Sequence, residues 1–477
     1  MVDDFQRIPS IISNAEGLQD KDRDTVRSLY QLYEQKLSRN LLRDHYYEMK
    51  QTPKDLGISV PPHLKDLEQV VGWCAKAVDS LANRSQFDGF VCDDETQLNA
   101  LQLVCRRNNL NRKYRKAVRS ELKHSCSFVT VTSSSRGKAL INVYPATAAA
   151  ALWSDYLGRI SSGMVVVDRD NTFNGKSKPI WVDVFTDDAV IEIKYIDNNW
   201  VAEYKYHSMG RCLMEALVHN ATLDRPMGTS RITRAVMNIT DSAMRASVRS
   251  EISAEFFTSP QKYLLGADKE ALGKQTKWDA YIGNIFAVAK DKTGATPQFG
   301  QLSQGTMQPH VDYMRALAAR FSGETNVPIS ELGIVSDNPS SAEAIYAAKE
   351  ALVIDAQNLN ADNSEALKRV AQMALAVETG SNLETVEEQT ETLQAKFKNP
   401  SLPSLVSQAD AIVKAISAFN WMADSDVALE EFGFNDDQMQ RLKQDRRKAK
   451  AQELATARFN ELSKADTNDN AESTESV

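Results

Sequence analysis

The sequence predicts a helix-rich α+β fold with several packed regions. Alternation of apolar and polar residues, with a period of two, is concentrated between Phe128 and Tyr206. Helical spacing dominates before and after that stretch. The chain has 477 residues, 42% hydrophobic and 25% charged, which is too long for one ordinary core and too apolar for wholesale disorder.

The first part of the chain predicts helices around a core. The run from Tyr30 to Tyr47 is aromatic and basic, and we expect a peripheral helix there, ending near Thr52-Pro53, with an exposed tyrosine-rich face. A second helix faces the core, because its apolar residues recur every three or four positions. These residues are Leu64, Leu67, Val71, Cys74, Val78 and Leu81. Another helix is expected from Asp94 to Arg107.

The alternating stretch predicts β-strands that complete an α/β region over roughly residues 25–225. A strand-like run starts at Phe128, and Asp197-Asn198-Asn199 supplies a turn between the last two runs. The remaining strand-like runs are Met164–Val167, Trp181–Phe185, Val190–Tyr195 and Trp200–Tyr204.

A helix is expected after Arg225-Pro-Met-Gly228, with Ile232, Val236 and Ile239 on its apolar side. Four arginines fall within an arc of roughly 60° on another side. They are Arg231, Arg234, Arg245 and Arg249. Two interpretations stay open for this stripe: a solvated or ion-paired face, and a surface that faces phosphates.

The next segment, Phe257–Gln308, is rich in glycine and poorly periodic, which indicates a compact inserted module with one strand-like run at Asn284–Ala289. An amphipathic helix follows, with Val311, Met314 and Phe321 on one face. After a polar loop that ends at Pro339, Ser340-Ser-Ala-Glu343 fits a capping box that opens a long helix. This helix can run to about Glu378, with a weak point at Asn358, Asn360 and Asn363.

The C-terminal part predicts two further helices, Leu405–Ala423 and Asp436–Leu462. The basic run Arg441–Lys450 is typical of a solvated helix face. Residues Ser463–Val477 are polar and acidic, and we expect a disordered tail there.

Catalytic and cofactor motifs are weak throughout the sequence. Gly266–Gln275 lacks the glycine spacing and hydroxyl of a phosphate-binding loop, and Gly175-Lys-Ser177 is better read as a turn. The six histidines lack metal-ligand spacing, and the five cysteines form no C-x-x-C pair, so we expect reduced thiols, no metal and no cofactor. The acidic clusters Asp93-Asp94-Glu95 and Asp187-Asp188 could hold Mg²⁺ in a nuclease, but they are also ordinary turn residues.

The net charge and the N-terminal residues further narrow the classes of protein to which this chain could belong. The net charge is −8, whereas proteins that grip nucleic acid usually carry a basic excess. No run approaches a spanning length of apolar residues, and Met1–Ser10 lacks the apolar region of a secretory signal. We therefore expect no membrane contact and location in the cytoplasm of the cell that makes the protein.

Several segments, in order, resemble the portal proteins of tailed bacteriophages, most closely the Gp6-like portals of long-tailed siphophages. Val327-Pro-Ile-Ser-Glu-Leu-Gly333 followed by Asn338–Ile345 is similar to the junction before the family's long kinked helix. Gly228-Thr-Ser-Arg-Ile232 resembles the start of the first stem helix. Ser404–Lys414 and Leu429–Phe434 resemble the C-terminal region, and Tyr30–Tyr33 with Val78–Leu81 fits the wing.

The resemblance implies a portal fold with an α/β wing, a two-helix stem, an α/β clip, a long kinked helix and a helical crown. The implied boundaries are 1–229 for the wing, 230–256 and 309–324 for the stem helices, 257–308 for the clip, 325–341 for a tunnel loop, 342–400 for the long helix and wing return, 401–462 for the crown and 463–477 for the tail.

The resemblance also implies site residues. The DNA-facing loop residues would be Asn326, Val327, Pro328, Ile329, Ser330, Glu331, Asp337 and Asn338. Glu331 and Asp337 are the only charges of this loop past Thr325, so it would meet DNA without gripping phosphates. The four arginines would lie at subunit contacts or in the channel, mainly paired with acids of neighbouring stems. Trp278 and Tyr281 would anchor partners on the clip, or simply pack within it.

The implied function is structural: a ring of twelve copies at one capsid vertex, through which double-stranded DNA enters and leaves. Its partners would be terminase, head–tail connector or adaptor proteins, and the major capsid and scaffolding proteins. It would assemble in the host cytoplasm and end in the virion. Two alternatives stay open, another phage head structural protein and a metal-dependent nucleic-acid-processing enzyme.

Overall fold

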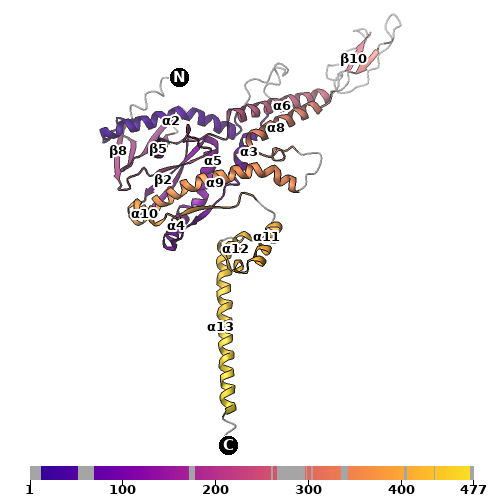
Figure 1. Cartoon of the computed structure of the whole chain (residues 1–477). Helices are drawn as coiled ribbons and strands as arrows, with labels where there is room; N and C mark the ends of the chain where they lie inside the picture. Colours follow the sequence, from indigo (N-terminus) through magenta and orange to yellow (C-terminus); the bar gives the residue numbers. More distant parts are fainter. Residues whose placement is uncertain are drawn as a thin grey trace. The chain divides into compact units, whose positions relative to one another are not determined.

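The computed structural model describes residues 12–51, 69–170, 178–258, 262–265, 296, 298–301, 305–334, 342–401, 405–434 and 436–472. The chain divides into two compact units, Met1–Pro400 and Ser401–Val477 (Figure 1). The first unit contains the sheets and most of the helices. It carries the arginines and the loop singled out above.

Two antiparallel sheets form the centre of the first unit. One has the strand order β3-β2-β9, and the other has the order β4-β5-β6-β7-β8. The strands are β2 (Cys126–Ser133), β3 (Ala139–Pro145), β4 (Ala149–Ser154), β5 (Arg159–Asp170), β6 (Lys178–Phe185), β7 (Ala189–Ile196), β8 (Asn199–Tyr206) and β9 (Met214–Val218). The predicted strands and the predicted turn are confirmed: Asp197 and Asn198 have positive φ angles of 48° and 70°, and Ile196 pairs with Asn199 across the hairpin.

Helix α2 (Asp20–Tyr47) covers one face of the five-stranded sheet (Figure 1). Its Val26 and Leu29 pack into one core with Val182 and Ile191 of that sheet. The expectation of exposed tyrosines is wrong, because Tyr30 and Tyr33 are 2% exposed and Tyr46 is 8% exposed. Tyr33 and Tyr46 bury their rings while each hydroxyl keeps a partner, Thr147 O for Tyr33 and the Asp241 carboxylate for Tyr46.

The larger core lies around the three-stranded sheet and the helices packed against it. These helices are α3 (Trp73–Ala82), α4 (Glu95–Asn108), α5 (Leu110–His124), α9 (Ala342–Thr379) and α10 (Leu383–Gln389). Cys74, Val78 and Leu81 of the predicted stripe are fully buried, whereas Leu64 and Leu67 lie outside the described residues. Strand β1 (Phe87–Val91) pairs with β12 (Gln394–Phe397), so the segment after α10 returns to the N-terminal part of the unit.

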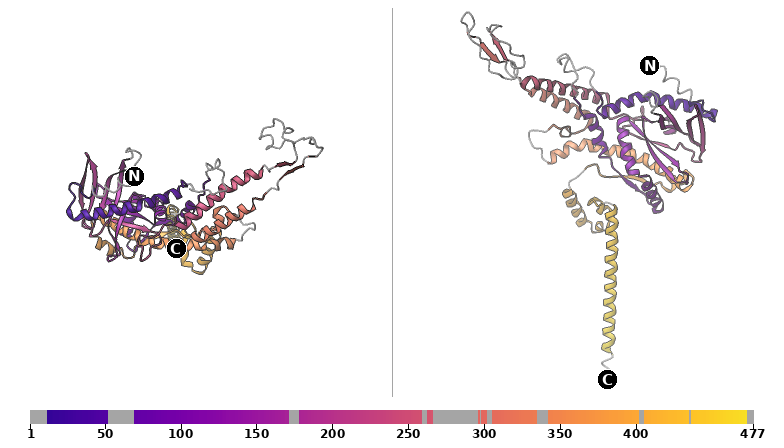
Figure 2. Two further views of the ribbon diagram at one scale, coloured as in Figure 1. Left: turned by 90° about the horizontal axis from the view of Figure 1, so that it is seen from above. Right: turned by 180° about the vertical axis from the view of Figure 1, so that it is seen from behind.

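Helices α6 (Arg234–Thr258) and α8 (Gln308–Thr325) lie side by side and extend from the unit (Figures 1 and 2). Val236, Ile239 and Ala243 of α6 and Leu317 and Phe321 of α8 are buried in the larger core. Two short strands, β10 (Lys262–Leu265) and β11 (Gln298–Gln301), pair between the two helices in sequence. The expected strand at 284–289 and the expected capping serines at 340 and 341 lie outside the described residues.

The second unit is helical. It contains α11 (Leu405–Ala418), a 3-10 helix η3 (Asn420–Asp424), α12 (Asp426–Glu431) and α13 (Asp436–Glu472). Helix α13 continues through the segment expected to be disordered from Ser463, as far as Glu472. The alanines, glutamates and lysine of this polar stretch are compatible with a helix, and it contains no proline or glycine to end one.

Candidate functional site: the junction of α6, α8 and α9

The segment just before α6 is fixed by a buried arginine. Arg231 is 8% exposed, and its Nε donates to the carbonyl of Ala77, 2.7 Å away at α3. Its guanidinium also donates to the carbonyl of Thr325, the last residue of α8, and lies 3.3 Å from the Asp355 carboxylate of α9. Burial lowers the pKa of Arg231, and the Asp355 charge opposes that effect. One side chain therefore joins α3, α8 and α9 at the base of α6.

The same carboxylate also holds the residue that ends α8. Asn326 adopts a left-handed conformation, with φ of 55°, and its side-chain amide donates to Asp355 Oδ2 over 3.1 Å. Asparagine tolerates this conformation better than most residues. Asp355 thus connects the base of α6 to the point where the chain leaves α8.

The first half of the loop after α8 packs against the rest of the unit. Val327 is fully buried, and the 3-10 helix η2 (Ile329–Leu332) follows. Glu331 accepts a hydrogen bond of 2.9 Å from Ser80 and lies 3.4 Å from Lys76 and 3.6 Å from Arg84. Burial raises the pKa of Glu331, but the Ser80 hydroxyl and the two cations outweigh it and hold the pKa below its usual value.

We expect the Glu331→Ala variant to loosen this half of the loop. Arg84 would keep its hydrogen bond to the Pro400 carbonyl but lose its carboxylate, with only 10% of its side chain exposed. The unfolding free energy should fall by about 1–2 kcal/mol, measured by urea unfolding, and limited proteolysis should cut between residues 325 and 341 sooner. Glu324→Ala, at an exposed position of α8, is the matched control; equal effects of both variants would contradict the anchor.

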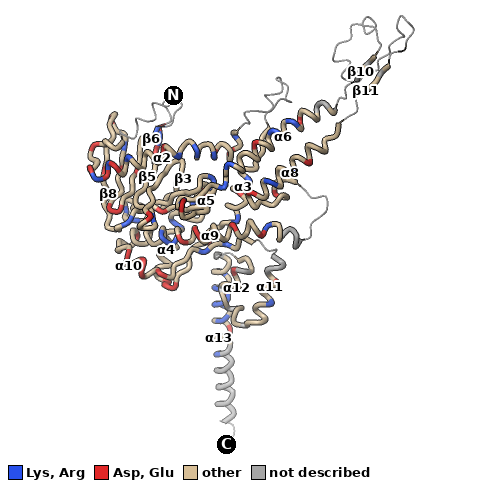
Figure 3. Tube along the Cα trace, turned by 45° about the horizontal axis from the view of Figure 1, so that its top comes forward, with Lys and Arg blue, Asp and Glu red and all other residues tan. Residues whose placement is uncertain are grey.

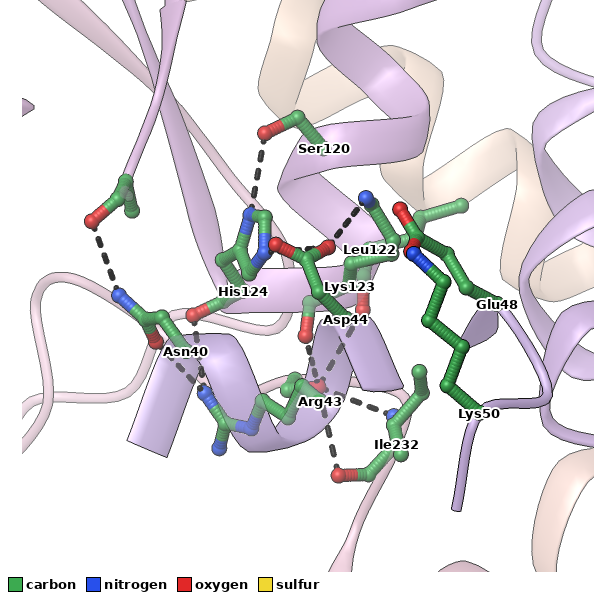
Figure 4. A network of polar contacts seen from close by, with 12 residues as sticks. Asn40, Arg43, Asp44, Glu48, Lys50, Ser120, Leu122, Lys123, His124 and Ile232 are labelled. Atoms are coloured by element: carbon green, nitrogen blue, oxygen red, sulfur yellow. Dashed lines mark hydrogen bonds and ion pairs between the residues drawn. The ribbon is translucent and has the colours of Figure 1, made fainter. Parts of the chain in front are cut away.

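A polar network braces the base of α6 from the other side (Figure 4). Arg43 of α2 donates to the His124 carbonyl at the end of α5, over 3.0 Å. Asp44 forms an ion pair with Lys123 at 2.5 Å and lies 3.1 Å from His124 Nε2. Burial raises the pKa of Asp44, but His124 and Lys123 outweigh it and bring the pKa to about 2. Burial lowers the pKa of His124, despite the nearby Asp44.

The four arginines do not form one uninterrupted helical stripe. Arg231 precedes α6 and is buried with partners of its own subunit. Ser230 binds a carbonyl near the end of α5, and Arg231 binds a carbonyl of α3, so neither residue is part of the helix. Arg234 is exposed, Arg245 and Arg249 are half-buried, and Arg245 donates to Ser242 over 3.0 Å. Contacts of these residues with neighbouring subunits or DNA stay a prediction.

Of the expected loop residues, the structure gathers those from Asn326 to Glu331 at this junction. Asp337, Asn338, Trp278 and Tyr281 lie outside the described residues. Sequence reasoning missed Asp355 and the three residues that hold Glu331, which are Lys76, Ser80 and Arg84. No local pattern could have found them, since Ser80 and Glu331 are 251 positions apart.

In the described part of the chain, no three histidine, cysteine or acidic residues come together in a way that could hold a metal ion. The described helices also include none with the length and apolar character needed to cross a membrane. The glycine-rich segment 266–275 and the triplet 175–177 lie outside the described residues.

Known proteins with similar sequences are portal proteins. The chain is 25% identical over 429 residues to the portal protein of Mycobacterium phage D29, covering 87% of this chain and 85% of that one. It is 26% identical over 386 residues to the portal protein of Mycobacterium phage L5, covering 77% of each.

Solved structures with a similar chain include several from gene transfer agent particles. One, from the virion of the native particle, has a TM-score of 0.44 at 12% identity and covers 80% of this chain and 89% of that one. Another, from the neck of the native particle computed with C12 symmetry, has a TM-score of 0.41 at 13% identity and covers 75% and 89%.

The family described as phage portal protein, SPP1 Gp6-like, matches residues 18–452. This range includes the two central sheets, the junction of α6, α8 and α9, and most of the second unit. The chain belongs to this family of phage portal proteins.

Proposed function

We propose that twelve copies of this chain form a ring at one capsid vertex, and that double-stranded DNA passes through its centre during packaging and ejection. The observation that carries this proposal is the junction at Arg231, which fixes the α6–α8 pair to the sheet-containing body. A helix pair held in this way can transmit load between a clip and a wing. The portal family supplies the ring and the channel as expectations.

The loop at 325–341 is proposed to meet the DNA without gripping it. Glu331 is engaged with Lys76 and Arg84, and the sequence offers no lysine or arginine between Asn326 and Ser341. A loop without cations releases no counterions from a DNA backbone, so it contributes little affinity that would stall the duplex.

The motor is proposed to be a separate terminase that docks on the segment between α6 and α8, where connector or adaptor proteins would later bind. Trp278 and Tyr281 are the proposed anchors. The chain itself would act as a structural protein of the virion, assembled in the host cytoplasm with major capsid and scaffolding proteins. The competing proposals are another head structural role and metal-dependent processing of nucleic acid.

Negative-stain microscopy of the purified full chain tests the ring directly. We expect rings with a central hole, and native mass spectrometry should give a mass of about twelve subunits, the number expected for the family. A protein that stays monomeric at all concentrations and cleaves DNA when Mg²⁺ is added would overturn the proposal. Rings that lack a central hole would favour another head structural role.

A further inference from the structure

A groove with basic edges crosses the first unit beside α2. Its volume is about 760 Å³, and its lining includes Phe128 and the alanines of β4. Lys36, Arg39 and Arg43 lie along one edge, at successive turns of α2. Arg225 and Arg234 line it from the segment before α6 and from the first turn of that helix. These five cations define the basic groove.

Among the described residues, acids do not balance the positive charge of the basic groove. Asp224 is the one acid among the described residues that line it. In the described structure, no ion pair engages the side chains of Lys36, Arg39, Arg225 or Arg234. Burial, and then the nearby charge of Arg39, lowers the pKa of Arg43 to about 10. Cations held together without acids favour an acidic partner.

The same unit carries an acidic surface. Asp93 and Glu95, at the start of α4, lie beside α10, because Gln97 binds Gln389 over 3.0 Å and the Asp93 N–H donates to Thr392. The acidic face comprises the exposed residues Asp93, Glu95, Glu384, Glu388 and Glu391. Within the described residues no ion pair engages these five carboxylates, although Lys368 Nζ donates to the backbone carbonyl of Glu391.

The helices that carry most of these charges lie on opposite sides of the first unit. Helix α2 is on one side, α4 and α10 are on the other, and the sheets and α9 lie between them (Figure 1). Basic segments follow α2, whereas acidic segments gather near α10 (Figure 3). One subunit cannot bring its own acidic face into its own groove, but a second copy can.

We propose that the basic groove of one subunit receives the acidic face, α4 and α10, of the next subunit. The contact joins two different surfaces, so a pair of subunits still has one free groove and one free acidic face. Further copies can add at these free surfaces, and the assembly becomes a closed ring when the rotation between neighbouring subunits divides a full turn evenly. This inference rests on the proposed ring and names the surfaces that would form it. The apolar residues in the groove lining, such as Leu32, Phe128 and Leu152, suit a polypeptide that brings apolar side chains with its acids better than a bare phosphate backbone.

Two charge-reversed variants test the contact. The groove variant combines Lys36→Glu, Arg39→Glu and Arg225→Glu, and the face variant combines Glu384→Lys, Glu388→Lys and Glu391→Lys. All six positions are exposed, so both variants should unfold thermally like the native protein. Each variant alone opposes like charges and should lose the ring. An equal mixture restores opposite charges at every contact and should recover alternating rings, which an even number of subunits can close.

The measurements are native mass spectrometry and negative-stain microscopy of each variant and of the mixture. The matched control, Arg112→Glu with Arg115→Glu and Lys116→Glu, makes the same charge change at exposed positions of α5 and should keep the ring. If the groove variant melts early, the neutral replacements Lys36→Gln, Arg39→Gln and Arg225→Gln should weaken ring formation. If the face variant melts early, Glu384→Gln, Glu388→Gln and Glu391→Gln should weaken it in the same way.

The inference is overturned if both variants form native rings, if the α5 control loses them equally, or if the mixture fails to recover them. If the groove variant forms intact rings that bind DNA more weakly than native rings, the groove would instead be a binding site for DNA phosphates. In all these outcomes the native ring, and with it the proposed function, would stand. Absence of rings from the native protein would overturn both.

Discussion

Replacing Arg231 by methionine is expected to lower the unfolding free energy of the protein by about 3–5 kcal/mol, the range for breaking a buried ion pair from one side. The variant would leave the carbonyls of Ala77 and Thr325 without their donor and Asp355 without its cation. Methionine fills similar space but donates no hydrogen bond. The loss of unfolding free energy therefore comes from buried polar groups without partners. These groups lie where α3, α6, α8 and α9 meet.

Urea unfolding followed by circular dichroism measures this effect. Arg320→Met, at an exposed position of α8 outside the basic groove, is the matched control and should change the unfolding free energy by no more than about 0.5 kcal/mol. Asp355→Asn should have an intermediate effect, because that side chain is 27% exposed and water can replace part of the contact. Equal losses for Arg231→Met and Arg320→Met would show that the junction does not depend on the buried guanidinium.

Local periodicity predicted the strands well, because alternation and turn chemistry are properties of neighbouring residues. The β7–β8 hairpin is the clearest case, where Asp197 and Asn198 adopt the positive φ angles that such a turn needs. The core-facing stripe of α3 was also predictable, as Cys74, Val78 and Leu81 show.

The features that could not be predicted depend on partners far along the chain. Tyr46 can be buried because its hydroxyl donates a hydrogen bond to the Asp241 carboxylate, which lies 195 positions away in the sequence. Arg231 fitted a helical stripe by spacing, yet the end of α5 and the carbonyl of Ala77 hold it out of the helix. Periodicity describes which residues share a face, but it does not say which distant group will satisfy a polar side chain.

A buried carboxyl group lies where α5 meets α9. Glu121 is fully buried, and its Oε2 accepts a hydrogen bond of 3.0 Å from Asn363 Nδ2. In the described structure, Glu121 Oε1 and Asn363 Oδ1 are buried without a partner. Burial raises the pKa of Glu121 to about 8, although the Asn363 hydrogen bond opposes the shift. A proton on the carboxyl group would supply the donor that Asn363 Oδ1 lacks.

The contribution of Glu121 to the stability of the native protein should therefore fall as the pH rises from 5 to 8. The folded protein holds the Glu121 proton up to about pH 8, whereas the unfolded chain releases it near the ordinary pKa of 4.5. The folded state then binds more protons across this window, so raising the pH favours unfolding. In Glu121→Gln, which cannot ionise, this contribution disappears, and the variant should gain on the order of 3 kcal/mol over the native protein between pH 5 and pH 8.

Urea unfolding of both proteins at a series of pH values isolates this contribution, since all other titrating groups cancel in the difference. Glu365→Gln, at an exposed position of the same helix α9, is the matched control and should follow the native pH profile. A Glu121→Gln profile parallel to the native one would mean that the carboxyl group is ionised in the folded protein at neutral pH. The pair with Asn363 would then require a charged oxygen buried between α5 and α9, which costs far more than a neutral acid in the same place.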